Sequence, residues 1–331
     1  MRNLVRAAAA GLLCLLAALA QAQGAYPPKP QGAYPSKAIR FIAPFPPGGS
    51  SDVLCRILGQ KLSELVGQPV VVENRAGASG NIGHEYAARQ PADGYTLVLS
   101  NNAALAINPH LFKRLGFDPH GDFAPVAMVA SAGQVLVVHP SVPAASVREL
   151  IALAKAKPGA LHFGSGGKGI PSHIAGENFK VAAGVAIVHV PYKGTVQAVA
   201  DLVGGQVQLV FSDMVPAIPH IRAGKLRALA VTSGERSAAL PEVPTMDEAG
   251  LPGFRSAVWW AVLAPKGTPA DIVARLNADF GRIVGMPDVR EKYASLGVST
   301  EHSTPQQVTE KIRSDTQEFA RILKAAGVEA E

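Results

Sequence analysis

Short apolar runs alternate along the chain with longer segments in which apolar residues recur at helical spacing. This alternation predicts an α/β fold in which helices flank a β-sheet. The expected strands are residues 39–43, 70–73, 95–99, 161–163, 186–190, 207–211 and 226–231. The expected helices between them are residues 53–66, 82–89, 172–183 and 196–203.

The strands form two series, which predicts two similar β/α lobes. Apolar segments at 135–139 and 258–263 stand at the breaks between the series, and we expect them to cross between the lobes. The predicted division is residues 37–137 plus 260–331 for a discontinuous domain 1, and residues 138–259 for domain 2. Two closing helices are expected to start at Thr268-Pro269 and at Thr304-Pro305, the second with a capping box completed by Gln307.

The N-terminal 22 residues have the features of a secretory signal peptide. Arg2 and Arg6 supply a basic start, residues 7–20 are apolar, and an A-x-A site ends at Ala22. We expect cleavage there, followed by a flexible leader over residues 23–36, which are rich in Pro, Gly and Gln. The sequence therefore predicts an exported protein.

Charge and cysteine content exclude several classes of protein. The formal net charge is +6, of which Arg2 and Arg6 supply two, and the other cations are scattered among acids, so we expect no nucleic-acid partner. No later segment reaches the roughly 18 uninterrupted apolar residues of a membrane span. Cys55 is the only cysteine after the signal peptide, which predicts a fold without an internal disulfide.

The loop between the first strand and the first helix has the composition of an anion site. Prolines stiffen it, two glycines remove side chains from its tip, and N-cap residue types follow, next to backbone N–H groups that lack helical partners. The residues concerned are Pro44, Phe45, Pro46, Pro47, Gly48, Gly49, Ser50, Ser51 and Asp52. A carboxylate held there would meet the positive end of a helix. The alternative is a well-capped turn without a ligand.

Other predicted strands also end in small or polar residues. Ligands bind beyond the carboxyl ends of parallel strands, so these loops are expected to line a cleft between the two lobes. The loops are Ser100-Asn101-Asn102, Gly164-Ser165-Gly166-Gly167-Lys168, Tyr192-Lys193-Gly194-Thr195 and Ser212-Asp213, together with Gly77-Ala78-Ser79-Gly80-Asn81 before the second helix.

Several motifs in one order resemble the Bug family, the periplasmic solute-binding proteins of tripartite tricarboxylate transporters. They are Tyr34-Pro35, residues 44–49, 70–75, 80–83, 93–97, 190–194, 223–230 and 263–265. The resemblance implies a two-lobe, Venus-flytrap fold of the type II periplasmic-binding-protein class. It also implies a periplasmic, monomeric protein that captures a small organic carboxylate and delivers it to membrane permease subunits. Di- and tricarboxylates, aromatic carboxylates and acidic amino acids are all suitable ligands.

Carried over by position, the resemblance implies a set of ligand-binding residues, with Phe45 as an aromatic wall. They are Phe45, Gly48, Gly49, Ser50, Ser51, Gly80, Asn81, Ser100, Asn101, Ser165, Gly166, His173, Tyr192, Lys193, Gly194, Thr195 and Asp213. One position departs from the family pattern. The family often has an acid directly after the aromatic residue of the 207–211 strand, where this chain has Ser212 and only then Asp213.

The motifs of enzymes are incomplete. The segment around Ser165 lacks the first glycine of G-x-S-x-G, because Phe163 stands there. As a P-loop it has His162 in place of the first glycine and Gly169 in place of the Ser/Thr. The histidines do not form H-E-x-x-H, so we expect no metal, no cofactor and no catalysis. Two alternatives stay open: a sensor module that presents a carboxylate to a membrane receptor, and a hydrolase built on Ser165, His173 and Asp213.

Overall fold

The computed structural model describes residues 34–325, 327, 328 and 330. The predicted signal peptide and most of the predicted leader lie outside these described residues. By its contacts the chain divides into the units Met1–Ser36 and Lys37–Glu331. All the helices and strands given below belong to the second unit.

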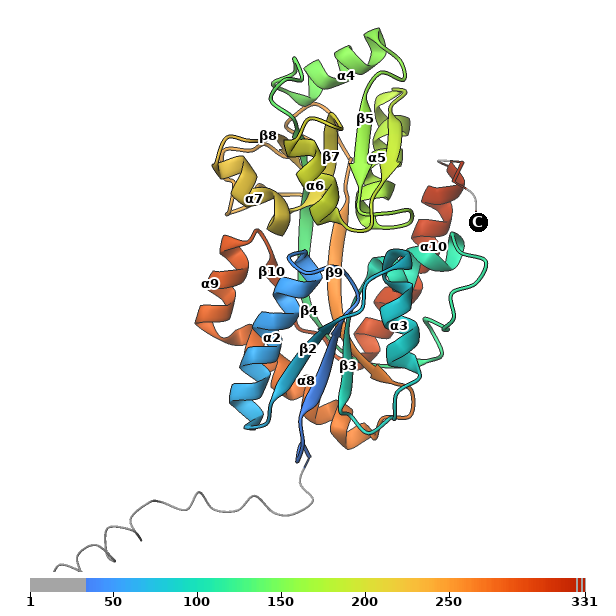
Figure 1. The fold of residues 1–331 in the computed structure, drawn as a ribbon, viewed down its shortest axis with the longest axis vertical. Helices are drawn as coiled ribbons and strands as arrows, with labels where there is room; N and C mark the ends of the chain where they lie inside the picture. The colour runs from blue at the N-terminus through green and yellow to red at the C-terminus, as the bar shows by residue number, and fades with distance from the viewer. Residues whose placement is uncertain (1–33, 326, 329, 331) are drawn as a thin grey trace, which may run out of the picture. The chain divides into compact units, whose positions relative to one another are not determined.

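A mixed β-sheet runs through this unit (Figure 1). Its strands are β1 (Ile39–Ala43), β2 (Val70–Asn74), β3 (Thr96–Asn101), β4 (Phe123–Val138), β5 (His162–Ser165), β6 (Val188–Pro191), β7 (Leu209–Asp213), β8 (Arg227–Val231), β9 (Ala257–Pro265) and β10 (Ser299–Thr300). The order along the sheet is β2-β1-β3-β9-β4-β7-β5-β6, and β8 and β10 also pair with β4. The strands β1, β2 and β3 are parallel to one another, as are β5, β6 and β7.

The long strand β4 joins two halves of the sheet. Its residues 123–133 pair with β9, and its residues 135–138 pair with β7 and β8. We call β1, β2, β3, β9, β10 and the first part of β4 the β1 half, and β5 to β8 with the end of β4 the β7 half. A segment that the sequence suggested as a short crossing, 135–139, is thus the end of a strand of 16 residues.

Helices cover both faces of each half (Figure 1). In the β7 half, Leu136 and Val138 of β4 pack with α4 and α5, and Val135 and Val137 pack with α6 and α7 on the opposite face. This division follows from the strand period of two, which sends successive side chains to opposite faces. The helices of this half are α4 (Val147–Ala156), α5 (Pro171–Ala183), α6 (Thr195–Val203) and α7 (Met214–Arg222).

The β1 half is built in the same way. On one face Phe41 of β1 packs against Phe280 of α8, with ring centroids 6.0 Å apart. On the other face Trp259 of β9 lies in a cluster with Val308 and Ile312 of α10. The helices of this half are α2 (Ser50–Val66), η1 (Ala78–Gly80), α3 (Asn81–Ala88), η2 (Ala103–Ile107), η3 (Asn108–His110), α8 (Ala270–Gly285), α9 (Pro287–Ser295) and α10 (Pro305–Ala325).

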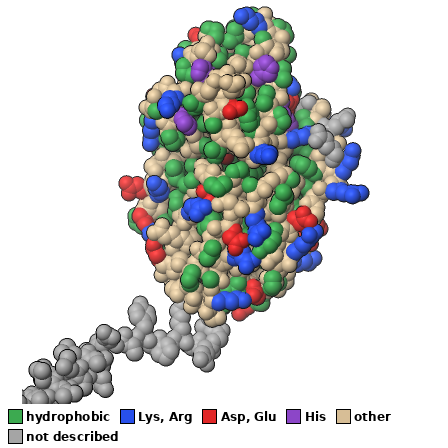
Figure 2. Space-filling model, viewed as in Figure 1, with side chains coloured by type: hydrophobic (Ala, Val, Ile, Leu, Met, Phe, Trp, Pro, Cys, Tyr) green, Lys and Arg blue, Asp and Glu red, His purple; other side chains and the backbone are tan. Residues whose placement is uncertain are grey.

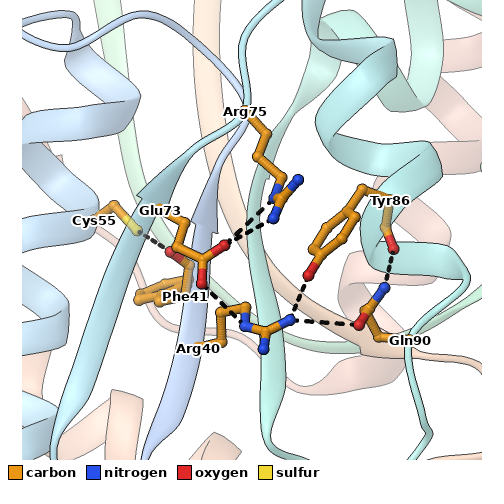
Figure 3. A network of polar contacts seen from close by, with 7 residues as sticks. All are labelled: Arg40, Phe41, Cys55, Glu73, Arg75, Tyr86 and Gln90. Carbon is orange, nitrogen blue, oxygen red and sulfur yellow. Dashed lines mark hydrogen bonds and ion pairs between the residues drawn. The ribbon is translucent and has the colours of Figure 1, made fainter.

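A polar network ties the edge of the β1 half to α3 (Figure 3). The Glu73 carboxylate on β2 pairs with Arg40 at 3.0 Å and with Arg75 at 3.1 Å. Arg40 also donates to the Tyr86 hydroxyl, and the Arg75 guanidinium lies 3.5 Å from the centre of the Tyr86 ring. The network is partly exposed, so we assign it to local positioning of β1, β2 and α3 rather than to the site.

The strands and helices expected from the sequence are present, with ends displaced by a few residues. The capping box of α10 is confirmed: the Gln307 N–H donates to the Thr304 hydroxyl at 3.2 Å, and the Thr304 N–H donates to Gln307 Oε1 at 2.8 Å. Helices α4, α7 and α9 and the first part of β4 were not predicted from the sequence. The expected side-chain cap of α2 was wrong, because the N-cap residue is Gly49 and makes no side-chain cap.

Two further properties of the described chain are its distribution of surface charge and the length and hydropathy of its helices. Figure 2 shows cations and acids mixed over the visible face, without a broad patch of one sign. Among the residues that the structure describes, no helix is both long and apolar enough to cross a bilayer.

Candidate functional site

A small cavity lies among the loops that precede α2, α5, α6 and α7. Both halves of the sheet contribute to it. Its lining residues are Phe45, Pro46, Gly49, Ser50, Ser51, Asn101, Ile170, Pro171, Ser172, Gly194, Thr195, Val196, Asp213 and Val258. It therefore lies where parallel strands end and helices begin, as the sequence predicted for the ligand.

The first turns of three helices line this cavity. Ser50 and Ser51 begin α2, Pro171 and Ser172 begin α5, and Thr195 begins α6. The first N–H groups of a helix have no intrahelical acceptor and carry the positive end of the helix dipole. Three such ends on one cavity favour an anionic group there without a basic side chain. Among the described lining residues there is no Lys, Arg or His.

Asp52 closes the loop before α2 and is directed away from the cavity. Its Oδ2 accepts the Gly48 N–H at 3.0 Å, and its Oδ1 accepts from Asn74 at 2.8 Å and from Arg56 at 3.0 Å. Burial acts to raise the pKa of Asp52, but the hydrogen bonds from Arg56, Gly48 and Asn74 outweigh it and leave the pKa below its ordinary value. Asp52 thus holds the loop in shape, and the Gly48 N–H is already used.

Several uncharged polar groups face or border the cavity. Asn101 accepts the Ala103 N–H through Oδ1 at 3.1 Å, and its amide nitrogen makes no hydrogen bond to another described residue. Ser172 accepts the Gly166 N–H at 3.1 Å, so its own hydroxyl proton stays available. Ser51 accepts from the Trp260 indole at 3.0 Å, which likewise leaves its proton free to donate. Uncharged donors next to helix N-termini suit an anionic ligand.

Asp213 is the charged residue of the lining. Its carboxylate accepts from the Ser50 hydroxyl at 3.2 Å, a contact between the two halves of the sheet, and from the Gln134 side chain. Burial raises the pKa of Asp213 to about 6, although these two hydrogen bonds oppose the shift. The aspartate that departs from the family pattern therefore reaches the cavity.

A second contact joins the halves beside the cavity. The Ser79 hydroxyl of η1 donates to the Lys168 carbonyl at 2.6 Å. Ser79 holds a left-handed backbone, with φ of 55°, which is uncommon outside glycine. Such conformations persist where the surrounding structure holds them, and they cluster at functional segments.

The structure brings eight of the predicted site residues into the cavity lining: Phe45, Gly49, Ser50, Ser51, Asn101, Gly194, Thr195 and Asp213. The others lie outside the lining, and the contacts described next account for several of them. These are Gly48, Gly80, Asn81, Ser100, Ser165, Gly166, His173, Tyr192 and Lys193.

Ser165 is fully buried under the cavity wall. Its Oγ lies 2.6 Å from His189 Nε2 and 3.0 Å from the Gly167 carbonyl oxygen. The His189 ring stacks on His173 with centroids 4.1 Å apart, and burial lowers the pKa of both, to about 4 and about 3. His173 accepts the Gly169 N–H. Ser165, His173 and Asp213 thus have separate partners and do not form the triad that the alternative hydrolase would need.

Three more predicted residues, Ser100, Gly80 and Asn81, lie outside the lining and contact residues near it. Ser100 is fully buried and bonds His84 Nε2 at 2.7 Å, while His84 Nδ1 lies 2.8 Å from the Gly80 carbonyl oxygen. Gly80 in turn faces the Phe45 ring, since a Cβ at Gly80 would lie 3.0 Å from that ring. His84 therefore holds the turn against which Phe45 rests. Asn81 is used in the same region by a 2.6 Å bond from Asn108.

The remaining predicted residues border α6. Tyr192 hydrogen bonds to Asp201, and burial raises the pKa of Tyr192 to about 12. Lys193 is exposed. Gly166 lies against the start of α6, where an added Cβ would come 2.5 Å from the Thr195 nitrogen. Gly166 is thus needed for the close approach of the loop before α5 to the start of α6.

The lining also contains residues outside the predicted ligand-binding set: Pro46, from the predicted anion-site loop, and Ile170, Pro171, Ser172, Val196 and Val258. Ser172 had a usable signal, because a hydroxyl residue follows Pro171 at the expected start of a helix. Val258 had none, since an apolar residue within a strand looks the same whether it faces a core or a ligand.

Comparison with known proteins agrees with this geometry. The R. palustris protein Rpa4515, solved with adipate, is 35% identical, superposes with a TM-score of 0.88, and the match covers 90% of this chain and 100% of that one. MatC from Rhodopseudomonas palustris, solved with bound malate, is 29% identical with a TM-score of 0.82, over 88% of this chain and 100% of that one. Fold and cavity thus define a solute-binding protein of the periplasmic-binding-protein class.

The sequence comparisons specify the family. Residues 54–328 match the model of the tripartite tricarboxylate transporter family receptor. Protein BugT of Bordetella pertussis is 40% identical over 317 residues, 96% of this chain and 97% of that protein. The chain belongs to the tripartite tricarboxylate transporter receptor family, which confirms the Bug-type assignment. Receptors of this family are periplasmic and carry ligands without catalysis.

Proposed function

We propose that this receptor binds a small organic carboxylate in the cavity between the two halves of its sheet and delivers it to the permease of a tripartite tricarboxylate-type transporter. The observation that carries the proposal is the meeting of three helix N-termini on a cavity whose described lining has no basic side chain. Backbone N–H groups and hydroxyls bind carboxylates with charge-assisted hydrogen bonds of about 1.5–3 kcal/mol each.

We further propose how the cavity is used. Ser51, Asn101, Ser172 and Thr195 donate to the ligand, while Phe45 forms an apolar wall. Ser165, Ser100 and His173 hold the surrounding loops. This assignment is supported by the lining and by the partners that the buried residues already have.

The proposal also covers the export of the chain and its division into two domains. Residues 1–22 act as a cleaved export signal, and residues 37–137 with 260–331 close against residues 138–259 around the ligand. The two contacts from Ser50 to Asp213 and from Ser79 to Lys168 support such closure, since each joins one half of the sheet to the other.

Calorimetry on the purified protein tests the carboxylate site. Thr195→Val removes a hydroxyl from the cavity at similar volume, and we expect at least a tenfold loss of affinity for the bound carboxylate. Thr309→Val on α10, outside the cavity lining, is the matched control and should bind as the unmodified protein does. Equal affinity in both variants would remove α6 from the site.

Delivery is tested separately from binding. Membranes that contain the permease should retain the ligand-loaded receptor more strongly than the ligand-free receptor. Retention by a signalling receptor in membranes that lack the permease would favour the sensor function instead.

A further inference from the structure

The described cavity lining combines a single acid, at the N-cap of α7, with the N-termini of three other helices. Asp213 is the one charged residue among its described lining residues. The same cavity is lined by three helix N-termini, which attract anions. A purely anionic ligand bound at these helix ends would also have to approach the Asp213 carboxylate.

The immediate partners of Asp213 are neutral. Ser50 donates to its Oδ2 at 3.2 Å, and Gln134 donates from β4. The orientation of the Gln134 amide is fixed because its Oε1 accepts the Ser256 hydroxyl at 2.7 Å, which leaves the NH₂ group for Asp213. These contacts orient the carboxylate and satisfy part of it, but they add no positive charge.

The preceding residue cannot replace Asp213. Ser212 is fully buried, and its hydroxyl donates to the Asp213 carbonyl at 2.8 Å. Successive residues of a strand face opposite sides, so the acid reaches the cavity only from position 213. Asp213 also immediately precedes α7, at the carboxyl end of β7. The acid faces the cavity and stands next to α7 because Ser212 comes before Asp213 in this chain.

Charge complementarity then distinguishes between ligands. A plain dicarboxylate would bring a second anion next to a partly desolvated acid, and like charges in such an environment repel strongly. An ammonium group would pair with the acid and offset the cost of its burial. A ligand that carries both a carboxylate and an ammonium group therefore matches both the helix N-termini and Asp213.

We propose that Asp213 is a specificity-determining residue that pairs with the ammonium group of an amino-carboxylate, while the helix N-termini bind the ligand's carboxylate. This inference rests on the proposed function, because it requires the carboxylate to bind in this cavity. It narrows the ligand from organic carboxylates in general to those that carry an amine.

Calorimetry with matched ligand pairs tests the inference. The pairs are aspartate and succinate, glutamate and glutarate, and phenylalanine and 3-phenylpropionate, which differ within each pair by the amine. In the unmodified protein the amine-bearing member of the best-binding pair should bind at least 30-fold more tightly. Asp213→Asn should reduce that preference at least tenfold, and Asp271→Asn, an acid in the first turn of α8, should leave it unchanged.

The outcomes separate the two proposals. Equal or tighter binding of the amine-free member would overturn the inference while leaving the carboxylate function intact, and so would an unchanged preference in Asp213→Asn. Failure of every carboxylate to bind would instead remove the proposed function and this inference with it. The comparison of ligand pairs in the unmodified protein needs no variant. If Asp213→Asn does not fold, Asp213→Ser serves as a second variant at the same position.

Discussion

Two aspartates near the start of α2 show how local partners decide what an acid does. Asp52 is buried with a cation and two neutral donors, and its pKa is held below the ordinary value. Asp213 has only neutral donors, and burial raises its pKa to about 6. The first acid stabilises a loop, whereas the second retains a charge that a ligand can use.

Asp213 gives a prediction for stability against pH. An acid with a raised pKa in the folded state binds its proton more tightly there than in the unfolded chain, so its contribution to stability falls as pH rises from about 4 to 6. Asp213→Asn removes this loss. Because Asp213 is partly open to the cavity, we expect the variant to gain roughly 1–3 kcal/mol of unfolding free energy at pH 7.5.

Urea denaturation of both proteins at pH 4.5 and 7.5 measures this difference. The gain should be present at the higher pH and largely absent at the lower. A variant less stable than the unmodified protein at pH 7.5 would mean that Asp213 is stabilised by its partners rather than strained by burial.

At the scale of elements, the loop before α5 and the start of α6 depend on their close approach. Gly166→Ala would place a Cβ 2.5 Å from the Thr195 nitrogen and 2.4 Å from the Ile170 side chain. One of the two loops must then move, and both line the cavity. We expect ligand affinity to fall at least tenfold in calorimetry, with a loss of stability of about 1–3 kcal/mol.

The matched control is Gly285→Ala at the end of α8, where an added Cβ meets nothing within 4 Å. It should bind ligand normally. If Gly166→Ala also binds normally, the two loops can separate without disturbing the site, and the ligand does not depend on their spacing.

Much of this element structure is predictable from sequence, and the exceptions have physical reasons. Strands such as β1 and helices such as α2 follow from apolar runs and periodicity. The first part of β4 was missed because Pro125, Ser131 and Gly133 interrupt its pattern, and two register shifts in its pairing with β9 accommodate irregular residues. Such tolerance depends on neighbouring strands, which local sequence does not reveal.

The site was predicted less completely than the fold. The polar loops at strand ends were correctly expected to converge, as Ser50, Asn101 and Thr195 do in the cavity. Sequence could not tell a hydroxyl that faces the cavity from one already bonded, as Ser165 is to His189. That distinction depends on residues 24 positions apart, which only the tertiary structure brings together.

For the molecule as a whole, the buried His84 and His173 and the partly buried His189 predict sensitivity to acid. Burial lowers the pKa of His84 to about 4, of His189 to about 4 and of His173 to about 3. The unfolded chain therefore binds protons more readily below pH 6.5, and stability falls as pH drops through that range. For His84, which is fully buried, the loss between pH 6.5 and 4 is roughly 3 kcal/mol.

Urea midpoints measured from pH 7 to 4 check this expectation. The decline should be shallower in His84→Gln, and it should be unchanged in His120→Gln, because His120 is exposed. A parallel decline in all three proteins would assign acid sensitivity to other groups.

The unbroken course of β4 limits how this receptor can respond to its ligand. Residues on either side of Gly133 are paired in different halves of the sheet, and an added Cβ at Gly133 would lie 2.8 Å from the Ser233 backbone. Any rotation between the halves must be absorbed as torsion of β4, close to the point where its pairing changes from β9 to β7 and β8. The two halves should therefore open and close by turning about one continuous strand, which keeps them connected in both states.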